Sequence, residues 1–206
     1  MVHRALPGTS LTRVSRIIAG RAGGQRLATP AHDRTRPTSD RVRESAFNLI
    51  ADWAGTTGEP ADEMLERFSF LDLYAGTAGV ALEAASRGAG PVVAVERDQA
   101  TAALARTNVR ATGLAVQVVA AAVEGYLVGG GRPFDVVWFD PPYDVPNRVV
   151  ERQVGLVAAS WLAPDGLVVV ERSARDMPFA WPDVLGARWH RRYGETTLYF
   201  ATKEPA

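Results

Sequence analysis

The chain has 206 residues, of which 47% are hydrophobic and 22% charged, and this composition is typical of one globular domain with at most a small appendage. It has no cysteine, three scattered histidines and no apolar run near 18 residues, which excludes disulfides and thiolate ligands and argues against a zinc site or a membrane span. The first ten residues also lack the apolar core of a signal peptide, so we expect a cytoplasmic, metal-free protein. Nothing in the sequence demands a dimer, and we expect a monomer.

The net charge of zero hides an uneven distribution along the chain. Residues 1–50 contain nine arginines and three acidic residues, a net charge of +6, whereas residues 51–206 carry a net charge of −6. A basic arm on an acidic body predicts a polyanionic partner that the arm binds. We therefore expect a basic N-terminal extension over residues 1–55 and a second unit, which carries the chemistry, over residues 56–206.

The N-terminal extension is predicted to contain a hairpin, a basic loop and a helix. The hairpin strands are expected over residues 15–20 and 25–29, because a Gly-Gly turn signal separates them. A helix that Thr38 or Ser39 can cap is expected to run to about Trp53.

Beyond a linker and a short helix over residues 61–67, strand patterns alternate with helix patterns. The expected strands are 70–74, 92–96, 116–119, 134–139, 166–170, 187–193 and 196–202, and the expected helices are 78–87, 99–112, 123–128 and 148–161. Repeated strand–helix units predict a parallel sheet with helices on both faces, an α/β fold.

A glycine-containing turn follows the first strand of this alternating region. Gly76 and Gly79 allow a tight turn that opens on a helix, and Glu96 ends the next strand, where an acid can bind ribose hydroxyls. A sharp strand–helix turn is the simpler alternative. The full Gly-x-Gly-x-x-Gly pattern of dinucleotide binders is missing, so the pocket suits a nucleoside with a charged amino-acid tail.

A second motif, Asp140-Pro141-Pro142-Tyr143, ends the apolar strand over residues 134–139. The two prolines cannot donate backbone hydrogen bonds and stiffen the turn. The resulting corner offers a carboxylate, carbonyl acceptors and an aromatic ring, which an exocyclic amine on a planar base requires. A plain turn closed by two prolines is again the alternative.

Asp72-x-Tyr-Ala-Gly-x-x-Gly79, Glu96 and the Asp-Pro-Pro-Tyr corner together resemble the class I S-adenosylmethionine-dependent methyltransferases that methylate amino groups. More closely, the chain is similar to the RsmD family of bacterial small-subunit rRNA guanine-N2 methyltransferases. Two further stretches carry this similarity, Arg16-Ile-Ile-Ala-Gly20 and the segment from Arg36 to Asn48, and it extends from about residue 15 to 202.

The resemblance implies a Rossmann-like class I methyltransferase fold, with a seven-stranded, mostly parallel sheet whose last strand is antiparallel, beside a small N-terminal hairpin and helix. It implies S-adenosylmethionine as the cofactor. Asp72, Gly76 and Gly79 would hold its methionine end and Glu96 its ribose. Backbone groups would approach the adenine, because the stretch after the third strand is all alanine. The residues implied to bind the cofactor are Asp72, Tyr74, Gly76, Gly79, Glu96, Arg97, Ala121 and Ala122.

The resemblance also implies 16S rRNA or the assembled small ribosomal subunit as the partner. The catalytic residues would be Asp140, Pro141, Pro142 and Tyr143, with Asp140 and the Pro141 carbonyl accepting from the guanine amine and Tyr143 stacking on the base. The candidates for phosphate contacts are Arg16, Arg21, Arg36, Arg41 and Arg43. Arg41 and Arg43 cannot face the same way on a helix, so one of them is expected to pair with an acid. Asn108 is expected on a helix surface.

Other acceptors remain open at this level. Asp-Pro-Pro-Tyr also occurs in DNA adenine-N6 and cytosine-N4 methyltransferases, and a related Asn-first motif serves protein glutamine methylation. The basic arm argues against a protein acceptor, and the lack of a target-recognition domain argues against sequence-specific DNA. A non-catalytic RNA-binding assembly factor is a third hypothesis, which the presence of Asp140 and Glu96 disfavours.

Overall fold

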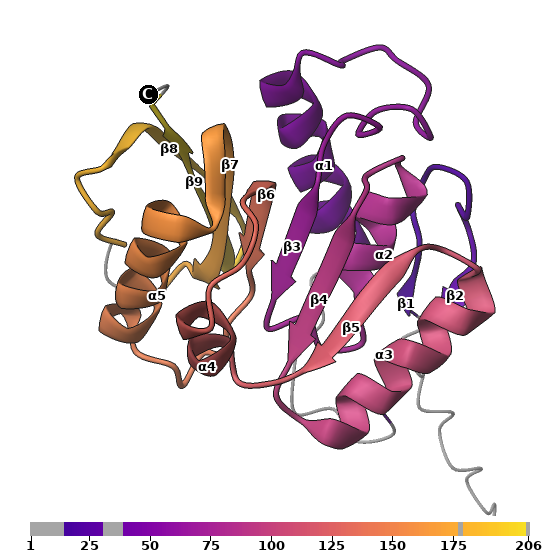
Figure 1. The fold of residues 1–206 in the computed structure, drawn as a ribbon. Coiled ribbons are helices and arrows are strands. Elements are labelled where there is room, and N and C mark those ends of the chain that lie inside the picture. The colour runs from indigo at the N-terminus through magenta and orange to yellow at the C-terminus, as the bar shows by residue number, and fades with distance from the viewer. Residues whose placement is uncertain (1–14, 31–38, 177–178, 205–206) are drawn as a thin grey trace, which may run out of the picture.

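The computed structural model describes residues 15–30, 39–176 and 179–204, and Figure 1 shows a central sheet with helices on both of its faces. The strands are β1 (Ser15–Arg16), β2 (Arg26–Leu27), β3 (Phe70–Leu73), β4 (Val92–Glu96), β5 (Val116–Ala120), β6 (Phe134–Phe139), β7 (Leu162–Ser173), β8 (Leu185–Tyr193) and β9 (Thr196–Lys203). The helices are α1 (Asp40–Ala54), α2 (Gly79–Ser86), α3 (Gln99–Thr112), α4 (Val123–Val128) and α5 (Asn147–Ser160).

Seven strands form one sheet in the order β5-β4-β3-β6-β7-β9-β8, while β1 and β2 pair as a separate two-stranded hairpin. The first five strands in this order, β5, β4, β3, β6 and β7, are parallel to one another. The last strand of the chain, β9, is antiparallel to both of its neighbours, β7 and β8. The expected seven-stranded, mostly parallel sheet with an antiparallel last strand is therefore confirmed. Parallel strands place their carboxyl ends at one edge, and that edge collects the candidate site residues.

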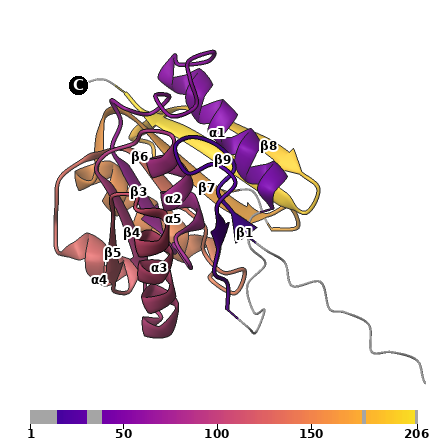
Figure 2. The same ribbon diagram turned by 90° about the vertical axis from the view of Figure 1, so that its right-hand side faces the viewer.

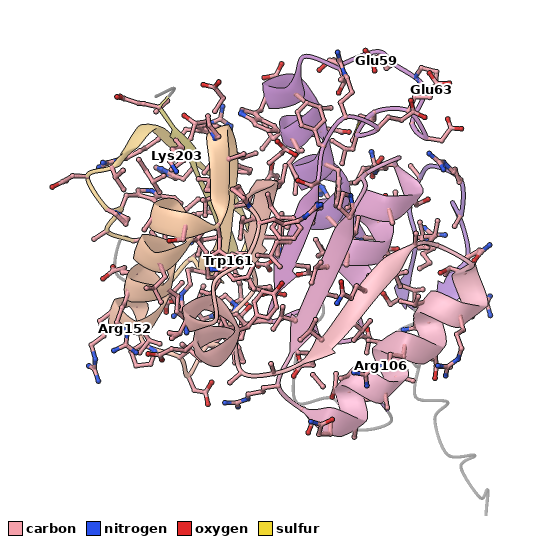
Figure 3. The ribbon with its side chains drawn as sticks, viewed as in Figure 1. Glu59, Glu63, Arg106, Arg152, Trp161 and Lys203 are labelled. Atoms are coloured by element: carbon pink, nitrogen blue, oxygen red, sulfur yellow. The ribbon has the colours of Figure 1, made fainter. Side chains whose placement is uncertain are left out.

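The sheet is buried on both faces, as the near-continuous apolar strand sequences require. Successive residues of a strand point to opposite faces, so Phe70 packs in the layer with α1, α2 and α3, whereas Leu71 packs in the layer with α4 and α5. Trp161, labelled in Figure 3, belongs to the second layer, and its indole N–H donates to the Leu127 carbonyl oxygen at 2.9 Å.

Two predictions about local structure have different outcomes. Ser39 caps α1, because its side-chain oxygen accepts a hydrogen bond from Val42 N–H at 3.3 Å. The helix predicted over residues 61–67 is wrong, since this segment is a series of turns. The Leu65 N–H donates to the Arg87 carbonyl at the end of α2, so a contact outside the segment replaces a helical hydrogen bond.

The N-terminal hairpin lies beside α2 in both ribbon views (Figure 1 and Figure 2) and is anchored there by a buried carboxylate. Glu83 has no exposed surface, and its two oxygens accept from Ile18 N–H at 2.7 Å and Ala19 N–H at 3.1 Å. The same carboxylate forms ion pairs with Arg87 at 2.7 Å and Arg43 at 3.8 Å. Apolar residues of the hairpin and α1 also share one core with those of β3 and α2, so the extension is an integral layer of the fold.

Candidate active site

Three acidic residues lie at or near the carboxyl edge of the sheet. Asp72 lies in β3, Glu96 ends β4, and Asp140 follows β6, the other neighbour of β3. Asp72 is 1% exposed, and its carboxylate accepts from Ala81 N–H at 3.0 Å. Burial raises the pKa of Asp72 well above its ordinary value, and the negative charges of Asp140 and Glu96 raise it further. This edge therefore has a negative potential that favours a cationic ligand.

The turn between β3 and α2 has unusual backbone geometry. Tyr74, Gly76 and Ala78 all have positive φ angles, of 64°, 54° and 64°. A β-carbon added to Gly76 would meet no atom within 4 Å, so the turn leaves open space above this residue. The Gly76 N–H donates to Glu96 at 2.9 Å, and the Asp98 N–H donates to the other oxygen of that carboxylate at 2.8 Å. The turn and Glu96, which the sequence predicts to belong to one site, are thus joined directly by a hydrogen bond.

The remaining predicted cofactor residues lie around this turn. Ala121 donates its N–H to the Glu96 carbonyl at 3.0 Å, and Ala122 precedes α4, so both lie at the carboxyl end of β5. The exposed Arg97 follows Glu96. The Tyr74 hydroxyl donates to Gln153 of α5 at 2.8 Å, and burial raises the Tyr74 pKa.

Gly79 begins α2 and faces the N-terminal extension. A β-carbon at this position would lie 3.3 Å from Arg43 Nη1, tighter than nearly all real β-carbon contacts. The absence of a side chain at Gly79 therefore makes room for the Arg43 guanidinium beside the turn between β3 and α2.

The Asp140-to-Tyr143 corner is held against the sheet. The Asp140 N–H donates to the Leu73 carbonyl at 3.3 Å, Pro141 is buried, and Tyr143 is 54% exposed. The Pro142 carbonyl accepts from Val145 N–H at 3.0 Å. Within the described part of the chain, no hydrogen bond to the Pro141 carbonyl is found.

Sequence reasoning missed Arg172, which braces this corner from β7. Its side chain is 3% exposed and donates to the Val145 carbonyl at 2.9 Å and, at 3.5 Å, to that of Pro142. The guanidinium also forms an ion pair with Asp176 at 3.0 Å. A basic residue two positions after the apolar run 166–170 was the available signal, but the carbonyls to which it donates lie about 30 residues away along the chain.

Four of the five arginines predicted to contact phosphate lie in the described part of the chain, and three of these four are exposed. Arg16 is exposed and pairs with Asp40 at 3.1 Å, whereas Arg21 is exposed and lies 3.7 Å from Glu66. Arg41 is also exposed. Arg36 lies outside the described residues.

Arg43, the fourth described candidate, needs correction. Its side chain is 3% exposed, pairs with Glu83 and Asp40, and donates to the Arg16 carbonyl, so it cannot reach a surface phosphate as it stands. Burial lowers its pKa, while the two carboxylates act in the opposite direction. The prediction that one of Arg41 and Arg43 pairs with an acid is confirmed by this contact with Asp40.

The surface placement expected for Asn108 is also wrong. This side chain is 2% exposed and accepts from Ala28 N–H at 2.8 Å. Its amide donates to the carbonyls of Ala28 and Thr77, each at 3.1 Å. Asn108 therefore joins the N-terminal extension to the turn that carries Gly76.

Neither a metal centre nor a membrane span is found in the part of the chain that the structure describes. No three His, Asp or Glu side chains there are grouped to hold a metal ion, and none of its helices is long and apolar enough to cross a membrane.

Comparisons with known proteins agree on one family. Residues 15–202 match the family described as conserved hypothetical protein 95. The chain is 31% identical over 158 residues to the ribosomal RNA small subunit methyltransferase D of Escherichia coli K12, covering 76% of this chain and 73% of that protein. It is 30% identical to the putative rRNA methyltransferase YlbH of Bacillus subtilis, covering 83% and 88% of the two chains.

Solved structures show the same fold. The putative methyltransferase yhhF of Escherichia coli superposes with a TM-score of 0.78 at 26% identity, covering 93% of this chain and 98% of that one. A Thermus thermophilus 16S rRNA N2 methyltransferase, solved in complex with AdoMet and guanosine, superposes with a TM-score of 0.66 at 23% identity. The match covers 93% of this chain and 50% of that one. The sheet order and these neighbours together confirm the Rossmann-like class I methyltransferase fold.

Proposed function

The chain belongs to the RsmD family, described as conserved hypothetical protein 95, and from this premise we propose that it methylates the N2 amine of a guanine in 16S rRNA with S-adenosylmethionine. The observation that carries the proposal is the position of the Asp140-to-Tyr143 corner beside Asp72 and Glu96 at the carboxyl edge of β3, β4 and β6. A methyl donor and an amine acceptor would meet there.

The pocket residues fit this cofactor. S-adenosylmethionine carries a sulfonium and an ammonium group, and their positive charges would offset the repulsion among Asp72, Glu96 and Asp140 that raises the Asp72 pKa. Glu96 would accept from the ribose hydroxyls, and the open turn at Gly76 would admit the methionine end. The backbone of Ala121 and Ala122 would border the adenine, and Gly79, Tyr74 and Arg97 would complete the pocket. When bound, the cofactor supplies an electrophilic methyl group.

The corner residues would prepare the acceptor. The lone pair of a guanine N2 amine is delocalised into the ring, so the amine is a poor nucleophile until hydrogen bonds fix its geometry. The Asp140 carboxylate and the Pro141 carbonyl would accept its two N–H groups and orient the lone pair, while the half-exposed Tyr143 ring would stack on the base. Asp140 would then accept the proton that the methylated amine releases.

The geometry also limits the substrate. A base paired in a duplex could not reach the corner, so the target would be a loop guanine or a flipped base. Such a substrate would place the protein with rRNA in the cytoplasm. Amino groups of DNA bases could also fit an Asp-Pro-Pro-Tyr corner, and the substrate comparison below separates the two.

The test is a methyl-transfer assay with labelled S-adenosylmethionine on 16S rRNA, assembled small subunits and DNA. Asp140→Ala should abolish transfer and leave cofactor affinity largely unchanged, because Asp72 and Glu96 remain. Asp144→Ala, an exposed aspartate of the same loop, is the matched control and should retain activity. Full activity of Asp140→Ala, or transfer to DNA in preference to rRNA, would refute the proposal.

A further inference from the structure

The C-terminal hairpin, formed by β8 and β9, is positively charged, whereas the rest of the body is acidic. Residues 185–203 contain four basic side chains and one acidic side chain, a net charge of +3. The rest of residues 51–206 carries ten basic and nineteen acidic residues, a net charge of −9. This contrast is as sharp as the one between the N-terminal arm and the body, yet it falls at the opposite end of the chain. A polyanion would therefore be attracted to the hairpin and repelled by its surroundings.

Arg191 and Arg192 of β8 supply half of the four positive charges of this hairpin. Both are exposed, and each guanidinium donates to a neutral backbone carbonyl, that of His190 at 3.0 Å and that of Gly194 at 3.1 Å. Among the described residues, neither forms an ion pair with a carboxylate. The N-terminal candidates Arg16 and Arg21 differ, because both lie beside acids. Arg191 and Arg192 are thus the freer cations.

The strand register brings these two arginines to the catalytic edge of the sheet. Arg192 of β8 and Arg172 of β7 are both register partners of Thr197 in β9. Adjacent strands lie about 4.8 Å apart, so the backbones of Arg192 and Arg172 are roughly 10 Å apart. Arg172 in turn holds the carbonyls of Pro142 and Val145 in the corner. Lys203, labelled in Figure 3, lies at the other end of the hairpin and does not share this position.

The strand that presents them is held on β9 by backbone pairing and by a stacked pair of aromatic rings. Trp189 of β8 stacks on Phe200 of β9 with ring centroids 5.2 Å apart and planes 5° apart. Because β8 ends the sheet order, one of its long sides has no neighbouring strand. Successive side chains of a strand point to opposite faces, so Arg191 and Arg192 flank this exposed edge from both sides. A fixed backbone lowers the entropy that phosphate binding would have to overcome.

We propose that Arg191 and Arg192 form a second RNA-contacting surface, the β8 arginine pair, which binds phosphates of nucleotides flanking the target guanine. This inference rests on the proposed function, because it assigns a role in holding the same RNA. The N-terminal hairpin lies beside α2 (Figure 1), whereas β8 lies at the end of the sheet beyond β7 and β9, so the β8 arginine pair adds a contact surface separate from the hairpin. The pair reads no base and contributes affinity through phosphate neutralisation.

The test measures binding of a 16S rRNA transcript over a salt series for an Arg191→Ala/Arg192→Ala variant. The matched control, Arg67→Ala/Arg110→Ala, removes the same charge from exposed arginines at the other edge of the sheet. Each lost phosphate contact should lower the slope of log K against log salt by about 0.7–0.9, so the β8 variant should lose about 1.5 in slope and roughly tenfold in affinity near 0.15 M salt. The control should match the wild type.

Cofactor affinity and melting temperature should be unchanged in both variants, because the four side chains lie outside the pocket and the core. A β8 variant whose salt slope equals that of the control would overturn the inference. A wild-type chain that binds rRNA but methylates none of it would contradict the proposed function alone, and the slopes would still decide the role of the β8 arginine pair.

Discussion

Replacing Glu83 with glutamine tests how the N-terminal extension is held on the body. The Glu83 carboxylate is fully buried and accepts two backbone N–H groups, from Ile18 and Ala19. It also neutralises Arg87 and Arg43, whose side chains are 5% and 3% exposed. Glutamine keeps one acceptor oxygen but no charge, so two buried guanidiniums would lose their shared counter-ion.

The expected loss of stability follows from this burial. Removing one partner of a buried ion pair costs about 3–5 kcal/mol, because the remaining charge stays buried without compensation. The single oxygen that glutamine retains favours the lower end, about 3 kcal/mol. For a chain of this size 1 kcal/mol corresponds to about 2–4 °C, so the melting temperature should fall by roughly 6–12 °C.

Urea and thermal unfolding followed by circular dichroism would measure the change. Glu124→Gln is the matched control, because Glu124 pairs with Arg152 at 2.9 Å while both side chains are about half exposed, and it should cost less than about 1 kcal/mol. Hydrogen exchange at Ile18 and Ala19 should also accelerate in Glu83→Gln alone. A Glu83→Gln variant as stable as the Glu124→Gln control would show that the buried carboxylate does not anchor the hairpin.

Three further predictions concern the site. Arg172→Ala should lower kcat by about tenfold or more with little change in cofactor affinity. Arg172→Lys should recover only part of the loss, because a lysine cannot donate in the same fork to two carbonyls. Equal kcat in the wild type and both variants would argue against a role of Arg172 in holding the Asp140-to-Tyr143 corner. Burial raises the pKa of Asp72 above 3.8, so its contribution to stability is present below that value and is lost as pH rises through the raised pKa. Asp72→Asn without cofactor should therefore melt higher than wild type at pH 7 yet bind S-adenosylmethionine more weakly, which thermal scans from pH 4 to 8 and calorimetry would check. Asn108→Ala should cost about 1–3 kcal/mol, because it removes the three hydrogen bonds by which the buried Asn108 amide joins Ala28 and Thr77, and a loss below 0.5 kcal/mol in urea unfolding would contradict this.

Much of the fold could be predicted because its signals are local. Apolar runs mark β3, β4 and β6, and Ser39 lies where a helix cap is needed. The segment over residues 61–67 has a helical composition, but the hydrogen bond from Leu65 to Arg87 overrides it. Propensity describes a segment alone, whereas this contact depends on a partner more than twenty residues away.

The contact between Gly76 and Glu96 could be predicted for the same reason, since these residues belong to adjacent strand ends whose order follows from the alternating pattern. The buried polar contacts of Asn108 and Arg43 could not be predicted from the sequence. Asn108 meets Ala28 across 80 residues, and Arg43 meets Glu83 across 40. Spacing gives no sign of such partners, so these side chains were expected at the surface.

The most direct test of the central proposal is to identify the atom that the enzyme methylates. Small subunits lacking the modification would be incubated with the wild-type chain and S-adenosylmethionine, and the modified nucleoside would be identified by mass spectrometry and mapped on 16S rRNA. We predict N2-methylguanosine at a single position, absent with Asp140→Ala. N6-methyladenosine, N4-methylcytosine, or no methylated nucleoside in rRNA would contradict the proposal.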